Sequence, residues 1–231
     1  MNIAVILSGG IGSRMGLDVP KQYVKVNGVP IICYCLKTFL ENDNTDIVII
    51  AVADEWKEFV RENVPSLHPS KPILYVQSGE TRQYSIFNAM RAIKNEGFAY
   101  DDVVLIHDAA RPLVSHDLIS RCYDGCNDAD GVLPVVPVKD TVYYSNDGKN
   151  IQTLLNRSHL WAGQAPEAFR FGKYLHAHES LEREELLKIN GSTELAFKAG
   201  LVCQMIEGDV MNFKITTPED LSNFESIIGK I

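Results

Sequence analysis

The stretch NIAVILSGGIGSRMG (Asn2–Gly16) joins a short apolar run to a loop that contains four glycines and one arginine. The run Ile3–Leu7 is apolar and rich in β-branched residues, which predicts a buried β-strand. The glycine-rich loop after it offers backbone N–H groups with no Cβ in the way, and such groups bind anionic oxygens. The stretch therefore predicts either a phosphate-binding loop at a strand end or a tight glycine turn without a ligand.

The spacing of these glycines differs from the two commonest phosphate-binding motifs. Gly9, Gly10, Gly12 and Gly16 match neither GxGxxG nor GxxxxGK[ST]. Two cations follow, however: Arg14 within the loop and Lys21 in the segment VPKQ. A guanidinium can grip phosphate oxygens as a fork, and an ammonium can stabilise charge that develops during phosphoryl transfer. Together they favour phosphate binding, although each cation alone would more often be a solvated surface residue.

Beyond this loop, short β-branched runs alternate with longer segments of helical periodicity. We expect strands at Ile3–Leu7, Asp46–Val52, Pro72–Val76, Asp102–Ile106 and Gly131–Val136. We expect helices between them near Ile31–Leu40, Glu55–Asn63, Arg82–Lys94 and His116–Cys126. This alternation predicts an α/β fold: a Rossmann-like, mostly parallel sheet with helices on both faces and ligands at the carboxyl ends of its strands.

The alternation changes after Val138. The segment 138–160 alternates polar and apolar residues on both sides of Asn146–Gly148, which predicts a protruding β-hairpin. A two-stranded arm is only marginally stable in water, so we expect this one to pack against a second copy as a dimerisation arm. Residues 1–231 are predicted to form one domain. Its last part comprises helical segments at Phe171–Lys188 and Thr193–Ala199, a strand at Leu201–Ile206 and a helix beginning at Thr217.

Composition limits the class of protein. The 231 residues are 45% hydrophobic and 23% charged, as in an ordinary soluble domain, and carry a net charge of −8. This negative charge argues against nucleic-acid binding, and no apolar segment approaches the length that crosses a membrane. The five cysteines form no CxxC pair, so we expect buried free thiols. A cytoplasmic location is therefore expected.

Six ordered blocks extend the pattern of the opening loop. They are SGGIGSRMG with PKQY, SGETRQYS (Ser78–Ser85), IHDAARP (Ile106–Pro112), PVKDT, NRSHLWAGQAPEAF (Asn156–Phe169) and NFKITTPEDL (Asn212–Leu221). In this order and over nearly the whole chain, they resemble the cytidylyltransferases that act on sugar-alcohol phosphates. That family includes the 2-C-methyl-D-erythritol 4-phosphate and D-ribitol 5-phosphate enzymes. The resemblance implies a reaction that joins CTP to an alditol phosphate, giving a CDP-alditol and pyrophosphate.

The resemblance also implies a nucleotide site. Ser8, Gly9, Gly10 and Gly12 would border CTP, with Arg14 and Lys21 as catalytic cations on the triphosphate. Gly79, Glu80 and Ser85 would recognise cytosine, and Asp108 and Ala109 would make further CTP contacts. Judged from the residues alone, SGETRQYS is a glycine turn followed by a helix N-cap, in which Arg82 holds the loop rather than a ligand.

Asp108 is the best metal candidate in the sequence. It ends a predicted strand beside two candidate nucleotide loops, and Mg²⁺ in such sites takes one or two carboxylates together with phosphate oxygens. The alternative is a carboxylate that caps a helix or turn. His107 precedes it, but a phosphate monoester near neutral pH is already largely ionised, so the reaction requires no catalytic base.

The second substrate also requires cations. The resemblance implies that Arg157 and Lys214 are catalytic and hold the alditol phosphate, with Thr141 as a further contact from the arm. If the arm crosses to a second copy, Thr141 and Arg157 complete the site of that copy. The alternatives are a solvent-facing strand residue for Lys214 and an ion pair on the arm for Arg157.

Some blocks depart from the methylerythritol pattern. Met211 stands where those enzymes usually carry an acid, and Ser192–Glu194 replaces a Thr-Asp-acid block, so roles for Asp209 and Glu194 are in doubt. NRSHLWAGQAPEAF favours the ribitol type, whereas HDAARP and KDT favour the methylerythritol type. We take D-ribitol 5-phosphate as the expected substrate, closely followed by 2-C-methyl-D-erythritol 4-phosphate.

Other classes of protein remain as alternatives. A nucleotidyltransferase that makes another nucleotide sugar would share the glycine loop and its cations, but not the SGETRQYS and NRSHLW blocks. A non-catalytic nucleotide-binding protein would not need the five charged residues that the resemblance assigns to the site, which are Arg14, Lys21, Asp108, Arg157 and Lys214. A dinucleotide-dependent dehydrogenase is the weakest alternative, because GxGxxG is absent.

Overall fold

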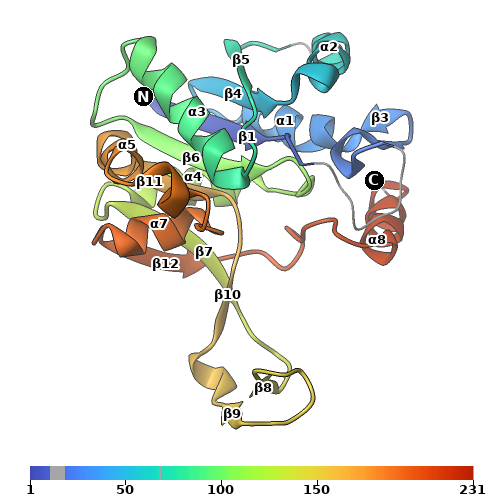
Figure 1. Cartoon of the computed structure of the whole chain (residues 1–231). Helices are drawn as coiled ribbons and strands as arrows, with labels where there is room; N and C mark the ends of the chain where they lie inside the picture. The colour runs from blue at the N-terminus through green and yellow to red at the C-terminus, as the bar shows by residue number, and fades with distance from the viewer. Residues whose placement is uncertain (11–18, 68, 231) are drawn as a thin grey trace.

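The apolar run that opens the chain forms strand β1 (Asn2–Leu7) in the middle of a mostly parallel sheet (Figure 1). The structure is a computed structural model that describes residues 1–10, 19–67 and 69–230. Ile3 to Ile6 are fully buried, because helices cover both faces of the sheet and every side chain of the strand meets one of them. This burial explains why the run is continuously apolar rather than alternating.

The sheet is parallel in the half that contains the N-terminal strands. β1 pairs with β4 (Ile47–Val52) on one side and with β6 (Val103–Asp108) on the other, and β4 pairs with β5 (Ile73–Gln77). The four strands therefore end at the same edge of the sheet. This arrangement confirms the predicted α/β class, and the predicted strands agree with the observed ones to within a few residues.

The other half of the sheet contains antiparallel strands that the sequence patterns did not predict. β11 (Glu167–Arg170) lies between β6 and β7 (Gly131–Pro137) and runs antiparallel to both. β10 (Trp161–Gly163) pairs antiparallel with the carboxyl end of β7, and β12 (Cys203–Glu207) pairs in parallel with the other edge of β7. β10 and β11 are too short for their periodicity to be recognised.

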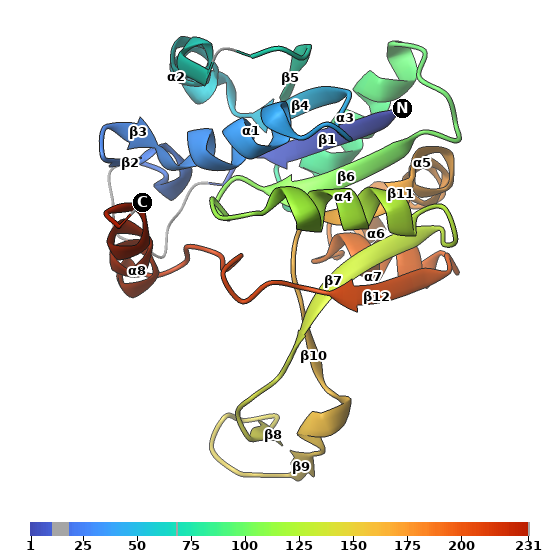
Figure 2. The same ribbon diagram turned by 180° about the vertical axis from the view of Figure 1, so that it is seen from behind.

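Helices form two layers, one on each face. One layer contains α1 (Ile31–Glu41), α2 (Asp54–Asn63) and α4 (His116–Gly125), which share a core with Ala4 and Ile6. The other contains α3 (Arg82–Asn95), α5 (Phe171–Glu179) and α7 (Ser192–Lys198), which share a core with Ile3 and Val5. Figure 1 shows α3, α5 and α7 in front of the sheet, and Figure 2 shows α1 and α4 from behind.

A third, smaller core holds the C-terminal helix α8 (Pro218–Ile228) against the hairpin of β2 (Lys25–Val26) and β3 (Val29–Pro30). Phe224 is fully buried there, and its ring meets Tyr34 edge-on with centroids 5.0 Å apart. Thr217 and Asp220 form a reciprocal capping box, which confirms the predicted helix start. The segment that leads into α8 is thereby held beside the strand ends.

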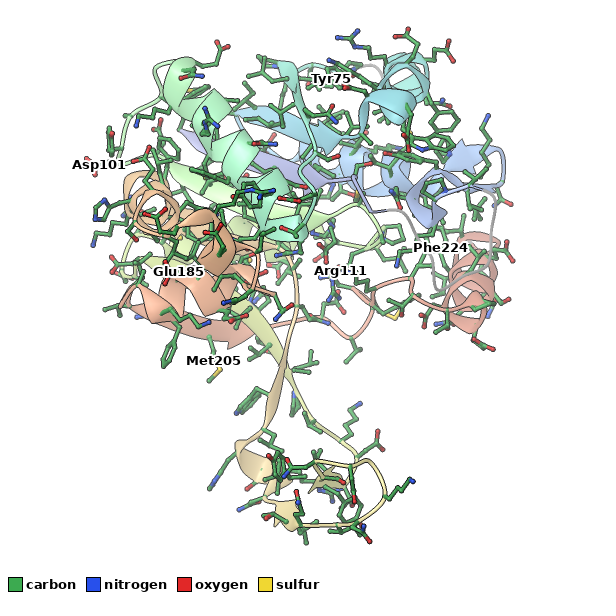
Figure 3. All side chains as sticks on the ribbon, viewed as in Figure 1. Tyr75, Asp101, Arg111, Glu185, Met205 and Phe224 are labelled. Carbon is green, nitrogen blue, oxygen red and sulfur yellow. The ribbon has the colours of Figure 1, made fainter. Side chains whose placement is uncertain are left out.

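The predicted arm is present and extends away from the rest of the molecule (Figure 3). Its strands β8 (Val142–Tyr144) and β9 (Thr153–Leu155) are antiparallel, and the helical turn η4 (Arg157–His159) follows them. The loop 145–152 is longer than a tight turn. Within it, Asp147 accepts hydrogen bonds from the backbone of Lys149 and Asn150. That 138–160 is a dimerisation arm on a single domain stays a prediction.

One predicted helix was wrong. Phe171–Lys188 does not form a continuous helix: α5 ends at Glu179, and the short α6 (Arg183–Leu186) begins after Glu182. The Glu182 side chain caps the start of α6, and the Glu185 carboxylate accepts a hydrogen bond from the backbone N–H of Glu182. This capping box starts a new helix where hydrophobic periodicity alone indicated continuation.

The remaining short helical turns are η2 (Lys21–Tyr23) and η3 (Val64–Leu67).

The five cysteines are free, as predicted, and four of them are buried. Burial raises the pKa of the Cys33 thiol to about 11 and that of Cys126 to about 12, so these thiols are protonated near neutral pH. Among the described residues, no helix combines the length and the apolar character needed to cross a membrane.

Candidate functional site

A cleft of about 650 Å³ opens at the carboxyl ends of β1, β4, β5 and β6. Ligands of parallel α/β sheets bind at this edge, where loops and helix N-termini converge. Eight of the predicted site residues line the cleft: Gly9, Gly10, Lys21, Gly79, Glu80, Ser85, Asp108 and Lys214. They come from five separate segments of the chain, so the fold brings together most of the residues that the sequence nominated.

Of the other six predicted residues, four do not line the cleft in this chain. Ser8 and Ala109 are buried behind the cleft, where the Ala109 N–H donates to the carbonyl of Leu7 at 3.0 Å. Thr141 and Arg157 lie on the arm, and the Arg157 guanidinium donates to the Lys139 carbonyl at 2.7 Å. Gly12 and Arg14 lie outside the described residues.

Two glycines that line the cleft lie too close to neighbouring residues for a larger side chain. A Cβ on Gly9 would lie 2.3 Å from the Cβ of Ser78, in the loop between β5 and α3. A Cβ on Gly79 would lie 2.3 Å from the Cβ of Tyr84. Both positions therefore require glycine because of neighbouring protein atoms. That glycine lets the loop approach anionic oxygens stays a prediction.

The β5–α3 loop is held by its own helix start. Thr81 caps α3 by accepting a hydrogen bond from the Tyr84 N–H at 3.2 Å. The Ser85 hydroxyl accepts from the Gly79 N–H and donates to the Thr81 carbonyl, both at 3.0 Å. The Glu80 carboxylate accepts from Arg183 of α6 at 2.6 Å. The helix-cap interpretation is thus confirmed, and the loop still lines the cleft.

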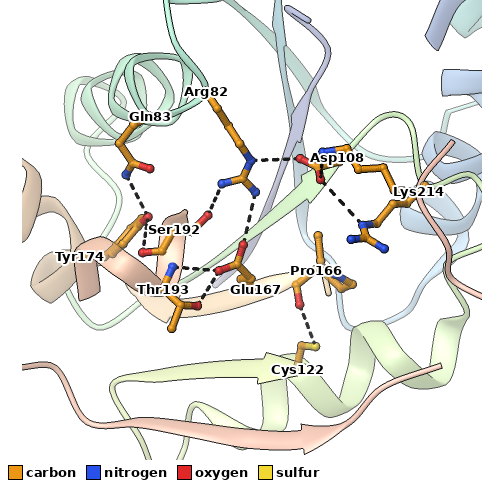
Figure 4. Close-up of polar contacts among 12 residues, drawn as sticks. Arg82, Gln83, Asp108, Cys122, Pro166, Glu167, Tyr174, Ser192, Thr193 and Lys214 are labelled. Carbon is orange, nitrogen blue, oxygen red and sulfur yellow. Dashed lines mark hydrogen bonds and ion pairs between the residues drawn. The ribbon is translucent and has the colours of Figure 1, made fainter. Parts of the chain in front are cut away.

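The strongest electrostatic feature of the cleft is Asp108, at the end of β6. Arg82 donates to its Oδ1 at 3.1 Å and Lys214 to its Oδ2 at 2.9 Å, and Arg111 lies 3.8 Å away (Figure 4). Burial alone would raise the pKa of Asp108, but the Arg82 guanidinium and the Lys214 ammonium outweigh it and hold that pKa far below its usual range. Asp108 is therefore a fixed anion that positions Lys214.

A second carboxylate, from Glu167 on β11, shares Arg82 with Asp108. Arg82 donates to Glu167 at 3.3 Å and to the Ser192 hydroxyl at 2.6 Å. Thr193, on α7, donates to Glu167 through its N–H at 2.9 Å and its hydroxyl at 2.6 Å (Figure 4). Arg82 therefore binds acidic side chains from two strands, rather than its own loop as expected, and it also lines the cleft.

The two acids that the sequence left in doubt do not join this cluster. Glu194 accepts from Lys198 at 2.8 Å and from the Asn190 N–H at 2.9 Å, and Asp209 accepts from the Met211 N–H at 2.8 Å. The second carboxylate bound by Arg82 is Glu167 instead. No local signal indicates this, because Glu167 belongs to a short strand whose neighbours come from distant parts of the chain.

His107 has the properties of a structural residue. Its side chain is fully buried, and its Nε2–H donates to the Arg111 carbonyl at 3.0 Å. Burial lowers the pKa of His107 to about 4, so the imidazole is neutral near pH 7. It does not line the cleft, in agreement with the expectation that the reaction needs no histidine base.

Asp108 fits a divalent cation only in company with a polyphosphate. Within the described ranges, no three acidic, histidine or cysteine side chains gather as a metal site. Both oxygens of Asp108 already have cationic partners, so a further divalent charge would be repelled unless phosphate oxygens accompany it. A single carboxylate together with phosphate oxygens and waters is nevertheless a common Mg²⁺ environment.

Comparisons with known proteins identify the family of this chain. The sequence model of the family described as IspD, 2-C-methyl-D-erythritol 4-phosphate cytidylyltransferase, matches residues 2–230. The protein of that name from Geobacter metallireducens is 37% identical over 226 residues, covering 97% of this chain and 96% of its own. The Clostridium beijerinckii protein of the same name is 35% identical over 228 residues, covering 99% and 98%.

A solved structure gives the same correspondence in three dimensions. The crystal structure of the Francisella tularensis 2-C-methyl-D-erythritol 4-phosphate cytidylyltransferase (IspD) covers 97% of this chain and 100% of its own. It superposes with a TM-score of 0.78 at 28% sequence identity. The similarity therefore extends over the sheet, both helix layers and the arm.

Proposed function

The chain belongs to the IspD family of nucleotidyltransferases, and we propose that it transfers the cytidylyl group of CTP to the phosphate of 2-C-methyl-D-erythritol 4-phosphate. The observation that carries this proposal is the convergence of two glycine-containing loops and two lysines on one cleft. The relatives named above all bear the methylerythritol name. They lend no support to D-ribitol 5-phosphate, which the sequence blocks slightly favoured.

The proposed reaction is a substitution at the α-phosphorus of CTP. An oxygen of the alditol phosphate forms the new P–O bond, the bond to the β-phosphate oxygen breaks, and its electron pair leaves with pyrophosphate. The attacking phosphate is ionised near neutral pH, so no proton must be removed. Catalysis then depends on aligning two polyanions and neutralising their charge.

The cleft offers matched groups for each part of the nucleotide. Gly9 and Gly10 present backbone to the triphosphate, and Lys21 supplies positive charge to it. Gly79, Glu80 and Ser85 are placed to contact cytosine in the facing loop. Gly12 and Arg14 complete the proposed CTP contacts, whereas Ser8 and Ala109 lie behind the cleft and support it.

Lys214 would serve the reacting phosphates from the opposite side. Its ammonium is held by Asp108 and lines the cleft. Asp108 would also hold a Mg²⁺ that enters with CTP, and such an ion would supply further neutralisation of the triphosphate. The alditol phosphate would be bound by Lys214 together with Thr141 and Arg157 from the arm of a second copy, since this chain's own arm stands away from its cleft (Figure 3).

Measuring pyrophosphate release with each of the four nucleoside triphosphates tests this function. Each nucleotide is paired with methylerythritol 4-phosphate, ribitol 5-phosphate and ribulose 5-phosphate. We expect turnover with CTP and methylerythritol 4-phosphate to exceed every other pair. Highest turnover with ribitol 5-phosphate would correct the substrate, and highest turnover with another nucleotide would establish the nucleotide-sugar alternative.

Two lysine-to-alanine variants, one in the cleft and one outside it, test the proposed site. Lys214→Ala should lower kcat/KM by about 10²–10³-fold, because it removes a cation from a partly buried site. Lys198→Ala removes an exposed lysine that pairs with Glu194 on α7 and should leave the rate unchanged. Full activity of Lys214→Ala would argue against the proposed site, and absence of turnover with every pair would favour a non-catalytic nucleotide-binding protein.

A further inference from the structure

Gln22 and Tyr23, in the turn η2, make buried hydrogen bonds to the opening glycine loop. They are 3% and 2% exposed. The Gln22 Nε2 donates to the carbonyl oxygens of Ser8 and Gly10, at 2.7 Å each. The Tyr23 hydroxyl lies 2.7 Å from the Ser8 carbonyl and 2.7 Å from the Ser8 hydroxyl. Two neighbouring side chains thus bind the carbonyls at both ends of the Gly9–Gly10 segment.

The direction of a carbonyl sets the direction of the next N–H. In a planar trans peptide the C=O and N–H bonds point in opposite directions, so holding the Ser8 carbonyl toward Gln22 turns the Gly9 N–H away from it. Over the described part of the chain, neither Gly9 nor Gly10 donates its N–H to another group, and both residues line the cleft. An anion in the cleft is therefore the available acceptor.

The rest of the molecule holds these two residues rigidly. The Tyr23 ring stacks on Trp56 of α2 with centroids 4.7 Å apart and meets Phe59 edge-on at 5.5 Å. The turn itself is closed by hydrogen bonds from the Tyr23 N–H to Pro20 and from the Val24 N–H to Lys21. Since Lys21 lies in the same turn, the contacts that fix the loop also fix the backbone that carries this cation.

From these contacts we infer that Gln22 and Tyr23 are positioning residues, which orient the glycine-loop amides and Lys21 toward the phosphate chain of a nucleoside triphosphate. The inference rests on the proposed function, because it takes CTP as the ligand of the cleft. It goes beyond that function by assigning the geometry of the loop to two side chains that act through the backbone. Gln22 is suited to this because its amide donates two hydrogen bonds without adding charge beside the triphosphate.

The test compares nucleotides that differ only in their phosphates. In Gln22→Met, which keeps the length of the side chain but cannot donate, calorimetry should show CTP binding weakened by about 10–100-fold. Binding of CMP, which lacks the β- and γ-phosphates, should weaken by less than about 3-fold. The ratio of CTP to CMP affinity is the decisive measurement, since a general loss of structure would weaken both nucleotides alike.

Two tyrosine variants make a matched pair. Tyr23→Phe retains the stacking on Trp56 and removes only the hydroxyl, so the affinity ratio should fall in the same direction by a smaller amount. Tyr34→Phe removes another hydroxyl that donates to a backbone carbonyl, that of Val26 at 2.8 Å, and should leave the ratio unchanged. If Gln22→Met does not fold, as judged by circular dichroism, the ratio in Tyr23→Phe decides the question.

The inference is overturned if the ratio of CTP to CMP affinity is unchanged in folded Gln22→Met. If Gln22→Met does not fold, an unchanged ratio in Tyr23→Phe overturns it. So does a wild-type protein that binds no CTP. A wild-type protein that binds CTP but releases no pyrophosphate would instead refute the proposed function. In that case the affinity ratio still decides whether these residues position the loop.

Discussion

The Arg82 guanidinium donates hydrogen bonds to Asp108, Glu167 and Ser192, and all three contacts lie in a partly buried region beside the cleft. Burial opposes the charge of Arg82, but Asp108 and Glu167 more than compensate and raise its pKa above the usual value. A planar fork with five N–H donors can serve three partners from fixed directions, which the compact ammonium of lysine cannot. At the scale of single residues, Arg82 therefore sets where Asp108 and, through it, Lys214 are held.

Arg82→Lys tests this role. The variant keeps the charge but loses the fork, so we expect the free energy of unfolding to fall by about 1–3 kcal/mol and kcat/KM by about 10–100-fold. Denaturant titration and initial-rate kinetics measure the two effects. Arg121→Lys is the control: its guanidinium also binds two partners, Asp117 and the Glu207 carbonyl, but does not line the cleft, so kcat/KM should not change appreciably. An Arg82→Lys variant as active as the wild type would show that the fork is dispensable.

The arm is the element whose sequence and structure are hardest to explain within one chain. Tyr143 and Leu154 on its two strands are 54% and 62% exposed, although tyrosine and leucine favour burial. The arm also carries Thr141 and Arg157. The resemblance assigns both residues to the substrate site, but neither lines the cleft of this chain. Both facts follow if the arm packs on a second copy and completes the site of that copy.

Mixing two inactive variants tests arm exchange. In a heterodimer of Arg157→Ala and Lys214→Ala chains, exchange gives one site with both native residues and one site with neither. Random association into two-fold dimers should then restore about a quarter of the wild-type activity. If each arm serves its own chain, every site lacks one residue and the mixture remains inactive. Pyrophosphate release after co-refolding measures the outcome, and co-refolding each variant with itself is the control.

At the scale of the whole molecule, the core contains two neutral imidazoles, those of His107 and His178. The Nδ1–H of His178 donates to the Tyr174 carbonyl at 2.9 Å, and its Nε2 accepts from Gln83 at 2.7 Å. Burial lowers the pKa of both histidines to about 4. In the unfolded chain they would titrate near 6.5, so below that pH the unfolded state binds more protons than the folded state.

The free energy of unfolding should therefore have its full value above about pH 6.5. It should fall as the pH is lowered toward 4, by at most about 1.4 kcal/mol per pH unit for each histidine. Denaturant midpoints measured between pH 7.5 and 4.5 report this slope. His178→Gln should be less stable at neutral pH but have a shallower slope. His159→Gln, exposed on the arm, controls for the loss of a histidine as such, and an unchanged slope in His178→Gln would contradict the prediction.

Much of the fold was predictable because its signals are local. The buried runs of β1, β4, β5 and β6, the helix that begins at Thr217 and the hairpin of the arm each depend on residues close together in the sequence. So do the strand-end loops, because a glycine turn after an apolar strand indicates a ligand edge wherever the strands of a parallel sheet align. Most of the nominated cleft residues lie in such loops.

The parallel sheet, the ligand edge and the cations available there were thus predictable from the sequence, since periodicity and turn chemistry are properties of short segments. Three features could be seen only in the folded chain: Glu167 joins Asp108 on Arg82, Gln22 and Tyr23 bind the Ser8 and Gly10 carbonyls, and Glu194 and Asp209 have partners elsewhere. Those outcomes depend on contacts between distant segments, notably an antiparallel strand inserted beside β6. The free energy of such contacts comes from packing and charge pairing in three dimensions, which no local pattern records.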